Sequence, residues 1–402
     1  MRILFVTEGD VSPLQGGTEH ITVTISSALM KLGHFCALAY CRPCPVSPVA
    51  VFDQKHQISQ DDYRQDIREY VRSGGFDAII SNLVDIKYKR RLLPELYLSC
   101  AGRGTVLLAC YHAMPGEELI GNTPACSLWR IRHGGALAPN LKDAAIRVCP
   151  QSLLRLLFRG RLRRKYRLMY DHCDRLVLLS KGFFEPFAAL AGVDVDEKFV
   201  ELHSALSYNE FLPEEEIPLK NKEVLIVSRL EERAKRLSRA LRIWRSIERE
   251  VGFEDWKLTI VGTGPDAEYY KAMASRLGLR RVSFEGRQED LLPYYRRASV
   301  FLMTSAYEGW GLTLTESQQM GVVPVVYKSY RSVTDIIDDG INGVLVRDGD
   351  QASYIRGLKA LMADTDRRCK MAAHAISSSH RFETGTIVRR LLDIIAQDDS
   401  RP

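Results

Sequence analysis

Short apolar runs alternate with longer polar or amphipathic segments along most of the chain. Runs of this kind, rich in aliphatic side chains, are typical of strands buried on both faces of a parallel sheet. Helical segments are predicted between many of them, including 18–32, and two closing helices are predicted at 351–375 and 383–397. This order predicts an α/β architecture with doubly wound parallel sheets. The predicted strands occupy residues 2–7, 34–40, 76–83, 105–112, 174–180, 199–202, 223–228, 257–262, 282–285, 299–304, 322–327 and 344–346.

Two domains are expected, because 402 residues are too many for one ordinary core. Two prolines and three consecutive glutamates mark a junction at residues 211–222. We therefore predict an N-terminal domain over 1–210, a linker over 211–222 and a C-terminal domain over 223–375. The final segment, 376–402, is expected to form a helix that packs back on the N-terminal domain. The apolar content of 46% and charged content of 26% are those of a globular protein.

Residues 299–326 concentrate the candidate chemistry. An apolar strand pattern ends there at a glycine-containing turn, and a polar helical segment follows from near Thr313. Gly309 and Gly311 allow backbone amides to approach a ligand closely. The start of the helix adds unpaired N–H groups and the positive end of a dipole. The stretch therefore predicts an anion-binding site.

Two carboxylates, Glu308 and Glu316, flank this turn with seven residues between them. Both side chains could reach one ligand from opposite ends. An alternative holds for Glu316, since the spacing from Thr313 to Glu316 also fits a capping box that would serve only the helix itself.

Basic residues follow the strand predicted at 223–228. Arg229 can donate two hydrogen bonds to phosphate oxygens, and Lys235 supplies a point charge. Arg233 is a possible substitute for Lys235.

Residues 262–267 spell G-x-G-x-x-A after a predicted strand, and Glu285 ends the next strand about twenty residues later. This layout is typical of dinucleotide binding and supports an alternative function, an NAD(P)-dependent oxidoreductase. Against it, the motif is not in the first strand–helix unit of the chain, Pro265 stiffens its turn, and no constellation for hydride transfer accompanies it.

Two further candidates lie in the N-terminal half. Gly16 and Gly17 stand between the first strand and the first helix, where glycines permit close ligand approach. His112 follows the strand predicted at 105–112, and side chains at the carboxyl ends of parallel strands face the ligand-binding edge of the sheet.

The sequence E-G-W-G-L-T-L-T-E, from Glu308 to Glu316, resembles the signature of the family 4 retaining glycosyltransferases, group 1 type. The resemblance implies the GT-B fold, two Rossmann-like domains facing a cleft, with the acceptor on the N-terminal side. It implies that Glu308 contacts the donor sugar and Glu316 the ribose hydroxyls. The pyrophosphate would bind the amides between them, at Gly309, Gly311, Leu312 and Thr313.

Other segments resemble the same family. S-R-L-E-E-R-A-K resembles its G-R-L-x-x-x-K-G segment, but has Ser228 for the first glycine, one extra residue before Lys235, and Arg236 after it. The resemblance also implies that the nucleobase lies near Arg287. Further donor-binding residues implied by it are Gly16, Gly17, Gly262 and Gly264, and the implied catalytic residues are Glu308, His112, Arg229 and Lys235.

The implied activity is transfer of a sugar, with retention, from a UDP- or GDP-sugar to a saccharide or lipid-linked acceptor in polysaccharide or glycolipid biosynthesis. No metal or other cofactor is expected, and Asp194-Val-Asp196, although it spells D-x-D, is interpreted as surface. A sugar-nucleotide epimerase on the same fold and a catalytically silent partner remain alternatives.

Positive charge gathers between Arg155 and Arg167, where seven basic residues interleave with leucines. The segment suits an anionic membrane surface or a lipid-linked phosphate, and a solvated helix face is an equal alternative. Nucleic acid is not expected, because no nucleic-acid-binding motif accompanies the charge. The N-terminus lacks the apolar region of a signal peptide, and the nine cysteines favour a reducing compartment. We therefore expect a cytoplasmic protein, with peripheral contact to the inner face of the membrane.

Overall fold

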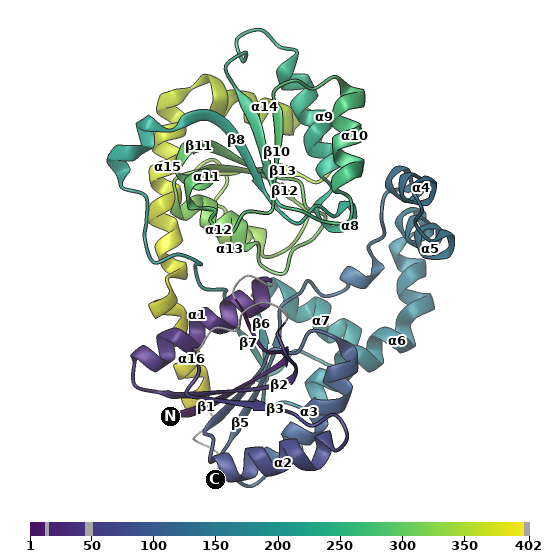
Figure 1. The fold of residues 1–402 in the computed structure, drawn as a ribbon, viewed down its shortest axis with the longest axis vertical. Coiled ribbons are helices and arrows are strands. Elements are labelled where there is room, and N and C mark those ends of the chain that lie inside the picture. The colour runs from purple at the N-terminus through teal and green to yellow at the C-terminus, as the bar shows by residue number, and fades with distance from the viewer. Residues whose placement is uncertain (13–15, 45–50, 398–402) are drawn as a thin grey trace. The chain divides into compact units, whose positions relative to one another are not determined.

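Seven parallel strands form the sheet of the N-terminal half in a computed structural model that describes residues 1–12, 16–44 and 51–397 (Figure 1). Their order in the sheet is β3-β2-β1-β4-β5-β6-β7, so the chain winds outward from β1 in both directions. The strands are β1 (Arg2–Gly9), β2 (Phe35–Arg42), β3 (Gln54–Gln57), β4 (Ala78–Ser81), β5 (Val106–Tyr111), β6 (Arg175–Leu178) and β7 (Phe199–Glu201).

Helices cover this sheet because its central strands are apolar on both faces. Ile3 to Val6 of β1 and all of β4 and β5 are buried. The last helix of the chain packs against the first one, α16 against α1. The α-helices that follow the strands here are α1 (Gly17–Lys31), α2 (Tyr63–Gly74), α3 (Ile86–Cys100), α6 (Gln151–Asp171), α7 (Phe184–Ala191) and α16 (Thr384–Ala396).

The second sheet has six parallel strands in the order β10-β9-β8-β11-β12-β13. It repeats the outward winding, this time from β8 and β11. The prediction of two doubly wound parallel sheets is therefore confirmed. The strands are β8 (Asn221–Val227), β9 (Lys257–Val261), β10 (Val282–Gly286), β11 (Ala298–Met303), β12 (Val323–Lys328) and β13 (Val344–Arg347).

Helices surround the second sheet as well. In the described part of the chain no helix is both long and apolar enough to cross a membrane. The α-helices of this part are α4 (Pro124–Arg132), α5 (Leu137–Val148), α8 (Glu232–Lys235), α9 (Leu237–Glu248), α10 (Ala267–Leu277), α11 (Leu292–Arg297), α12 (Leu312–Gln319), α13 (Val333–Ile336), α14 (Gln351–Ala363) and α15 (Thr365–Ser379).

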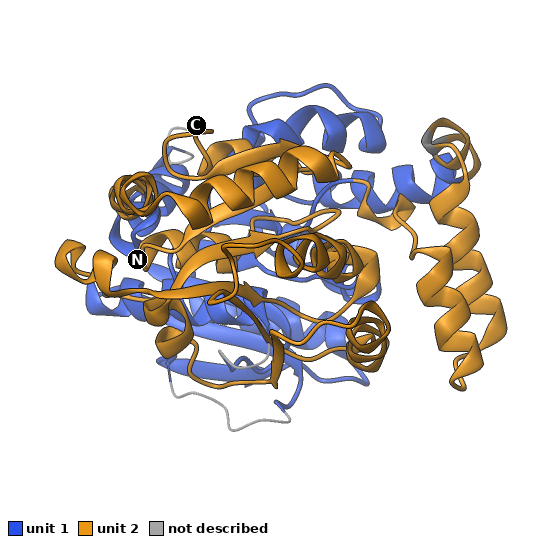
Figure 2. Cartoon of the chain, turned by 90° about the horizontal axis from the view of Figure 1, so that it is seen from above, with its two compact units in different colours: residues 1–115, 158–207, 382–402 blue, residues 116–157, 208–381 orange. Residues whose placement is uncertain are grey.

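The chain divides into two compact units, which differ in part from the predicted boundaries (Figure 2). Unit 1 comprises residues 1–115, 158–207 and 382–402, and unit 2 comprises 116–157 and 208–381. Residues 116–157, which we name the helical arm, were predicted within the N-terminal domain but group with unit 2. The physical reason is a set of polar contacts from the arm to α8 and α10.

Some predicted elements need correction. The segment 351–375 is two helices, α14 and α15, because Asp364 leaves helical geometry and accepts a hydrogen bond from Arg367 N to cap α15. The linker predicted at 211–222 is not irregular throughout, since a 3₁₀ helix spans Glu214–Leu219 and β8 begins at Asn221. The strand β3 was not predicted, and its sequence QKHQ has no apolar side chain.

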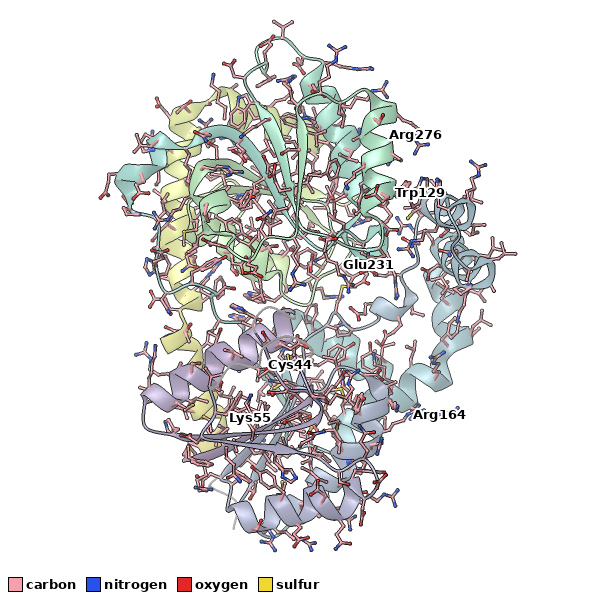
Figure 3. The ribbon with its side chains drawn as sticks, in the orientation of Figure 1. Cys44, Lys55, Trp129, Arg164, Glu231 and Arg276 are labelled. Carbon is pink, nitrogen blue, oxygen red and sulfur yellow. The ribbon has the colours of Figure 1, made fainter. Side chains whose placement is uncertain are left out.

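A buried ion pair connects the helical arm to the rest of unit 2. Nε and Nη2 of Arg130, on α4, donate to the two carboxylate oxygens of Asp266 at 2.6 and 2.7 Å. The Asp266 side chain is fully buried, and it also accepts from the backbone amide of Glu232 at 2.8 Å. Trp129 lies beside α10 (Figure 3), with its ring 5.7 Å from that of Tyr269. The arm is therefore part of the folded body of unit 2.

Removing the cation of this pair should loosen the arm. We expect Arg130→Ala to lower the free energy of opening of the arm by about 3 kcal/mol, because the buried carboxylate of Asp266 loses its charged partner. Hydrogen–deuterium exchange of peptides from α4 measures this opening. Arg132→Ala, at an exposed position of the same helix, is the control and should change it by less than about 0.5 kcal/mol. Equal exchange in the two variants would contradict the role of the pair.

Candidate functional site

The reversal of strand order in unit 2 occurs between β8 and β11. In open parallel sheets, the loops that leave such a pair of strands diverge to opposite faces and leave a crevice at the carboxyl ends. The segments after β8 and β11 carry most of the predicted site residues. A small pocket there is lined by, among others, Ser228, Lys235, Glu308 and Thr313.

The turn before α12 is shaped by a glycine in the left-handed region. Gly311 has φ 105° and is the N-cap residue, and none of the described side chains caps the helix. Glycine is required there because other residues are strained at this angle. The first amides of α12 thus remain available to an anion, and anion binding there stays a prediction. The capping-box alternative was wrong, because Gly311 and not Thr313 occupies the N-cap position.

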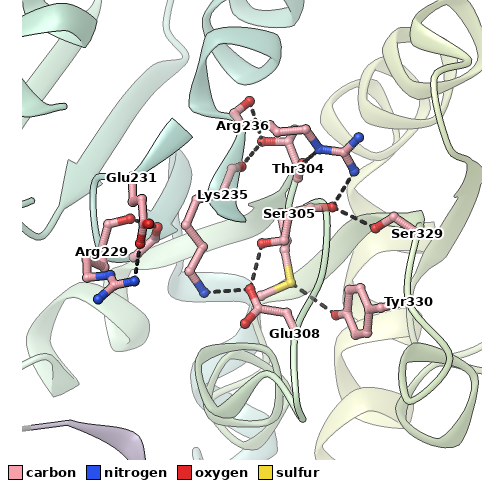
Figure 4. A network of polar contacts seen from close by, with 11 residues as sticks. Arg229, Glu231, Lys235, Arg236, Thr304, Ser305, Glu308, Ser329 and Tyr330 are labelled. Carbon is pink, nitrogen blue, oxygen red and sulfur yellow. Dashed lines mark hydrogen bonds and ion pairs between the residues drawn. The ribbon is translucent and has the colours of Figure 1, made fainter. Parts of the chain in front are cut away.

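Lys235 and Glu308 form an ion pair at the centre of the site. Nζ of Lys235 donates to Oε1 of Glu308 at 2.6 Å, and the hydroxyl of Ser305 donates to the same oxygen at 2.6 Å. Both charged side chains are largely shielded from solvent, with 20% and 11% exposed. Figure 4 shows them pointing toward one another from α8 and from the loop after β11. Two residues that are 73 positions apart are thus brought into one site.

Arg236 holds this arrangement together. Its backbone is left-handed, with φ 49°, the one non-glycine residue with positive φ in the described chain. Its guanidinium donates to the carbonyls of Thr304 and Ser305 at 3.3 and 2.7 Å, while the Thr304 hydroxyl donates back to the carbonyl of Lys235 at 3.0 Å. Burial, and next the charge of Arg239, lower the pKa of Arg236 to about 10. These bonds offset the strain of about 1 kcal/mol at that backbone angle.

Arg229 lies two residues after the end of β8 and is 67% exposed, and its Nη2 donates to the carboxylate of Glu231. Arg233, considered as a substitute for Lys235, serves elsewhere. Nε and Nη2 of Arg233 donate to the carbonyls of Ile120 and Glu117 in the helical arm, at 2.6 and 3.1 Å. Of the basic residues predicted here, Lys235 is the one paired with Glu308.

The glycines of the G-x-G-x-x-A motif are explained by contacts within the chain. A Cβ atom at Gly262 would lie 1.9 Å from the carbonyl oxygen of Ser228, and one at Gly264 would lie 2.4 Å from that of Leu230. The two loops after β8 and β9 therefore cross too closely for any side chain. Close packing of the loops therefore explains the glycine motif without a bound dinucleotide. Contact between these glycines and the sugar-nucleotide donor stays a prediction.

Glu316 and Arg287 differ in their exposure to solvent. Glu316 is buried and accepts a hydrogen bond from the Tyr295 hydroxyl at 2.7 Å. Burial, and next the charge of Glu316, raise the pKa of Tyr295 well above its ordinary value. Arg287 is exposed just after β10, and the amide of Gly262 donates to the preceding carbonyl, that of Gly286, at 2.8 Å. The ends of β9 and β10 thus meet at this edge of the sheet.

Unit 1 has its own pocket at the reversal between β1 and β4. The pocket measures about 580 Å³ and is lined by Gly17, Glu19 and Asn82, among others. Gly17 is the first residue of α1, and Gly16 is extended, with φ 179°. Of the two glycines predicted from the first loop, Gly17 borders this pocket, and Gly16 directly precedes it in the chain.

His112 reaches the same region through a chain of hydrogen bonds. Its Nε2 lies 2.9 Å from Oδ1 of Asn82, whose Nδ2 donates to the hydroxyl of Thr22 at 2.8 Å. Since the Asn82 amide nitrogen is occupied as a donor, Oδ1 accepts and His112 carries its proton on Nε2. Burial, and next the charge of Lys89, lower the pKa of His112 to about 4. His112 is therefore neutral at pH 7, and Nδ1 is an acceptor.

Several residues of this geometry were missed at the sequence level. Asn82 and Arg236 fix His112 and the loop after β11 through side-chain bonds to partners distant in the chain. Ser305 fixes Glu308, three residues further along the same loop. Asp196 of the D-x-D sequence accepts hydrogen bonds from the Tyr170 hydroxyl and, at 3.2 Å, from the amide of Lys198. Those contacts give it a structural role.

The protonation state of His112 can be measured directly. We expect its NMR titration midpoint near pH 4, against an ordinary value of about 6.5, because burial and Lys89 both disfavour the imidazolium. The His112→Gln variant assigns the resonance by its absence. A midpoint at or above 6.5 would contradict the neutral imidazole.

Relatives of known class match part of the chain. Residues 207–378 match the family described as glycosyl transferases group 1. D-inositol 3-phosphate glycosyltransferase of Xylanimonas cellulosilytica is 36% identical over 134 residues, 33% of this chain and 32% of that protein. An uncharacterized glycosyltransferase of Haemophilus influenzae is 27% identical over 204 residues, 50% of this chain and 55% of that protein. The chain thus spans between about a third and about half the length of these relatives.

Solved structures match nearly the whole chain at low identity. Anabaena HepE, in complex with UDP and glucose, is 17% identical with a TM-score of 0.70, covering 99% of this chain and 100% of that chain. The pneumococcal O-GlcNAc transferase GtfA, in complex with UDP and GlcNAc, is 11% identical with a TM-score of 0.71, covering 99% of each chain. Likeness at these identities concerns the fold. The chain has the GT-B fold, and its residues 207–378 are similar to the group 1 glycosyl transferases.

Proposed function

We propose that this protein is a retaining glycosyltransferase that moves a hexose from a UDP- or GDP-sugar to a saccharide or lipid-linked acceptor in polysaccharide or glycolipid biosynthesis. The observation that carries the proposal is the ion pair of Lys235 and Glu308 beside the uncapped start of α12. It combines a cation, a carboxylate and free amides at the strand reversal of unit 2, which is where a sheet of this kind binds ligands. The family match of residues 207–378 supports it.

The leaving diphosphate needs positive charge and hydrogen-bond donors. In the proposal, Lys235, the exposed Arg229 and the amides of residues 311–313 bind the two phosphates. They stabilise the charge that develops when the bond between the anomeric carbon and the phosphate oxygen breaks. The electron pair of that bond stays on the phosphate.

The donor sugar is assigned to Glu308. Both described hydrogen bonds to this carboxylate end on Oε1, so we assign Oε2 to the sugar hydroxyls. Glu316, held by Tyr295, is assigned to the ribose, and Gly262, Gly264 and Arg287 to the nucleotide. In unit 1, Gly16, Gly17 and the neutral His112 are assigned to the transferred sugar and its phosphates.

The acceptor oxygen forms its bond to the anomeric carbon on the face that the phosphate leaves, which retains the configuration. Its proton passes to an oxygen of the departing diphosphate. No protein nucleophile and no metal takes part in this route.

Donor binding is the first expected outcome. One class of sugar nucleotide, UDP- or GDP-linked, should raise the melting temperature of the wild type with EDTA present. Arg229→Ala should weaken binding of the free nucleoside diphosphate roughly tenfold, because a phosphate-binding cation is lost. Glu308→Gln should lower kcat/KM at least about a hundredfold without weakening free nucleotide binding, because the sugar loses its carboxylate contact while Lys235 keeps its charge for the phosphates. Thermal shift, calorimetry and initial rates measure these effects.

Glu268→Gln is the matched control for Glu308→Gln, since Glu268 also pairs with a lysine, Lys271, but at the exposed surface. It should behave as the wild type. If NADH alone stabilises the protein, the proposed transferase function is wrong and an oxidoreductase function takes its place. If the protein converts the donor into an epimeric sugar nucleotide without an acceptor, it is an epimerase.

Stereochemistry and metal dependence are the next outcome. Proton NMR of the product should show the anomeric configuration of the donor, and the rate should be the same in EDTA and in Mg²⁺ or Mn²⁺. Inversion of configuration would refute the front-face route, and full loss of activity in EDTA with recovery by a divalent ion would refute metal independence.

A further inference from the structure

The helical arm exposes an unusual share of apolar side chains. Seven of the fifteen large hydrophobic side chains that are exposed in the described chain lie in the arm. They come from α4, α5 and the first turns of α6, and Val148 is 71% exposed. The seven are Leu128, Leu137, Leu141, Val148, Leu153, Leu156 and Leu157.

Those on α5 form one stripe. Leu137, Leu141 and Val148 are spaced at i, i+4 and i+11, and this spacing places them on the same face of a helix. Such a stripe normally faces a core, but here it is exposed, while Asn140 is the buried side chain of the helix. The amphipathic pattern is therefore present without a protein partner in the described chain.

The exposed face of α6 changes from apolar to basic along its length. Leu153, Leu156 and Leu157 are exposed in its first turns, and Arg161 and Arg164 continue the same face at i+4 and i+7 from Leu157. Figure 3 shows Arg164 on this helix. Leu162, Tyr166 and Met169 form the opposite, buried face. The side chain of Arg155, at the start of the predicted basic segment, lies outside the described residues.

Charge is concentrated in the same region. Residues 124–170 contain eleven arginines and lysines and one acidic residue, Asp143. The whole chain has a net charge of +6, so the rest of it is net negative. Lys142 and Arg147 lie on α5 itself, next to the stripe, and both are exposed.

We propose that the stripe of α5 and the first turns of α6 form a docking surface for a lipid bilayer that contains anionic headgroups. Leucines and a valine on a short helix can enter the boundary between headgroups and acyl chains, while adjacent cations contact the lipid phosphates. The ion pair of Arg130 with Asp266 holds the arm in a fixed arrangement within unit 2, so little ordering entropy is lost on docking.

Charge favours a bilayer over the other occupants. A second copy of this chain would bring two strongly basic arms face to face, because a two-fold interface joins the same patch on both copies. Nucleic acid would use the arginines but would leave the exposed leucines in water. An anionic membrane surface satisfies both the apolar and the basic side chains. This docking does not depend on the proposed transferase activity.

Vesicle flotation tests the proposal with the full-length protein. We expect binding to vesicles of phosphatidylcholine mixed with phosphatidylglycerol, and at least roughly tenfold weaker binding to vesicles of phosphatidylcholine alone. The combined variant Leu137→Ser, Leu141→Ser and Val148→Ser should lower the partition coefficient for anionic vesicles roughly a hundredfold. The combined variant Lys142→Gln and Arg147→Gln should lower it roughly tenfold and reduce its salt dependence.

Two exposed apolar residues outside the arm supply the matched control. Leu219 and Val251 are 77% and 89% exposed, and their replacement by serine should leave vesicle binding unchanged. Circular dichroism and donor-induced thermal shift report whether each variant is folded, independently of lipid.

Three results would overturn the proposal. One is equal binding of the wild type to neutral and anionic vesicles, and another is wild-type binding by the α5 serine variant. The third is a wild type that ignores vesicles but sediments as a dimer, with the α5 variant monomeric, which would assign the surface to a second copy. Loss of donor binding with vesicle binding intact would affect the transferase proposal alone.

Discussion

A buried carboxylate organises unit 2. Asp266 lies where the loop after β9 enters α10, out of reach of solvent, and an unpaired charge at such a place would cost several kcal/mol. The charge is tolerated because the amide of Glu232, the guanidinium of Arg130 and the thiol of Cys126 all donate to it. One residue thus joins α10, the start of α8 and the helical arm. The position of α8 in turn sets the position of Lys235.

The strand reversals explain why the candidate residues gather where they do. In unit 2 the loops after β8 and β9 pack closely because Gly262 and Gly264 leave no side chain between them. The small pocket there is lined by polar groups such as Lys235 and Glu308 together with apolar side chains of β8 and β11. Loops are usually the variable part of such folds, but here their backbones are fixed by hydrogen bonds from Arg236 and Thr304.

Much of the fold and part of the site could be predicted from the sequence, since hydrophobic periodicity and the glycine–carboxylate spacing are local patterns. The sequence located nearly every strand, and it singled out Glu308, Lys235 and Gly311. It could not reveal that the arm groups with unit 2, because Arg130 meets Asp266 136 positions away. Nor could it reveal that Arg236 has a left-handed conformation, since the bonds that hold it there go to the loop after β11. The sequence could not show why Gly262 and Gly264 are glycines, because close packing of two loops and close approach of a ligand both require a residue without a side chain.

The shortness of α8 has a mechanical consequence. Arg233 is bonded to two carbonyls of the arm, and Lys235, two residues later on the same single turn, is bonded to Glu308. The helix has only four residues, so Arg233 and Lys235 move together. A displacement of the arm must therefore either break the hydrogen bonds of Arg233 or move Lys235, the partner of Glu308. The arm and the charged pair are thus connected through a single helical turn.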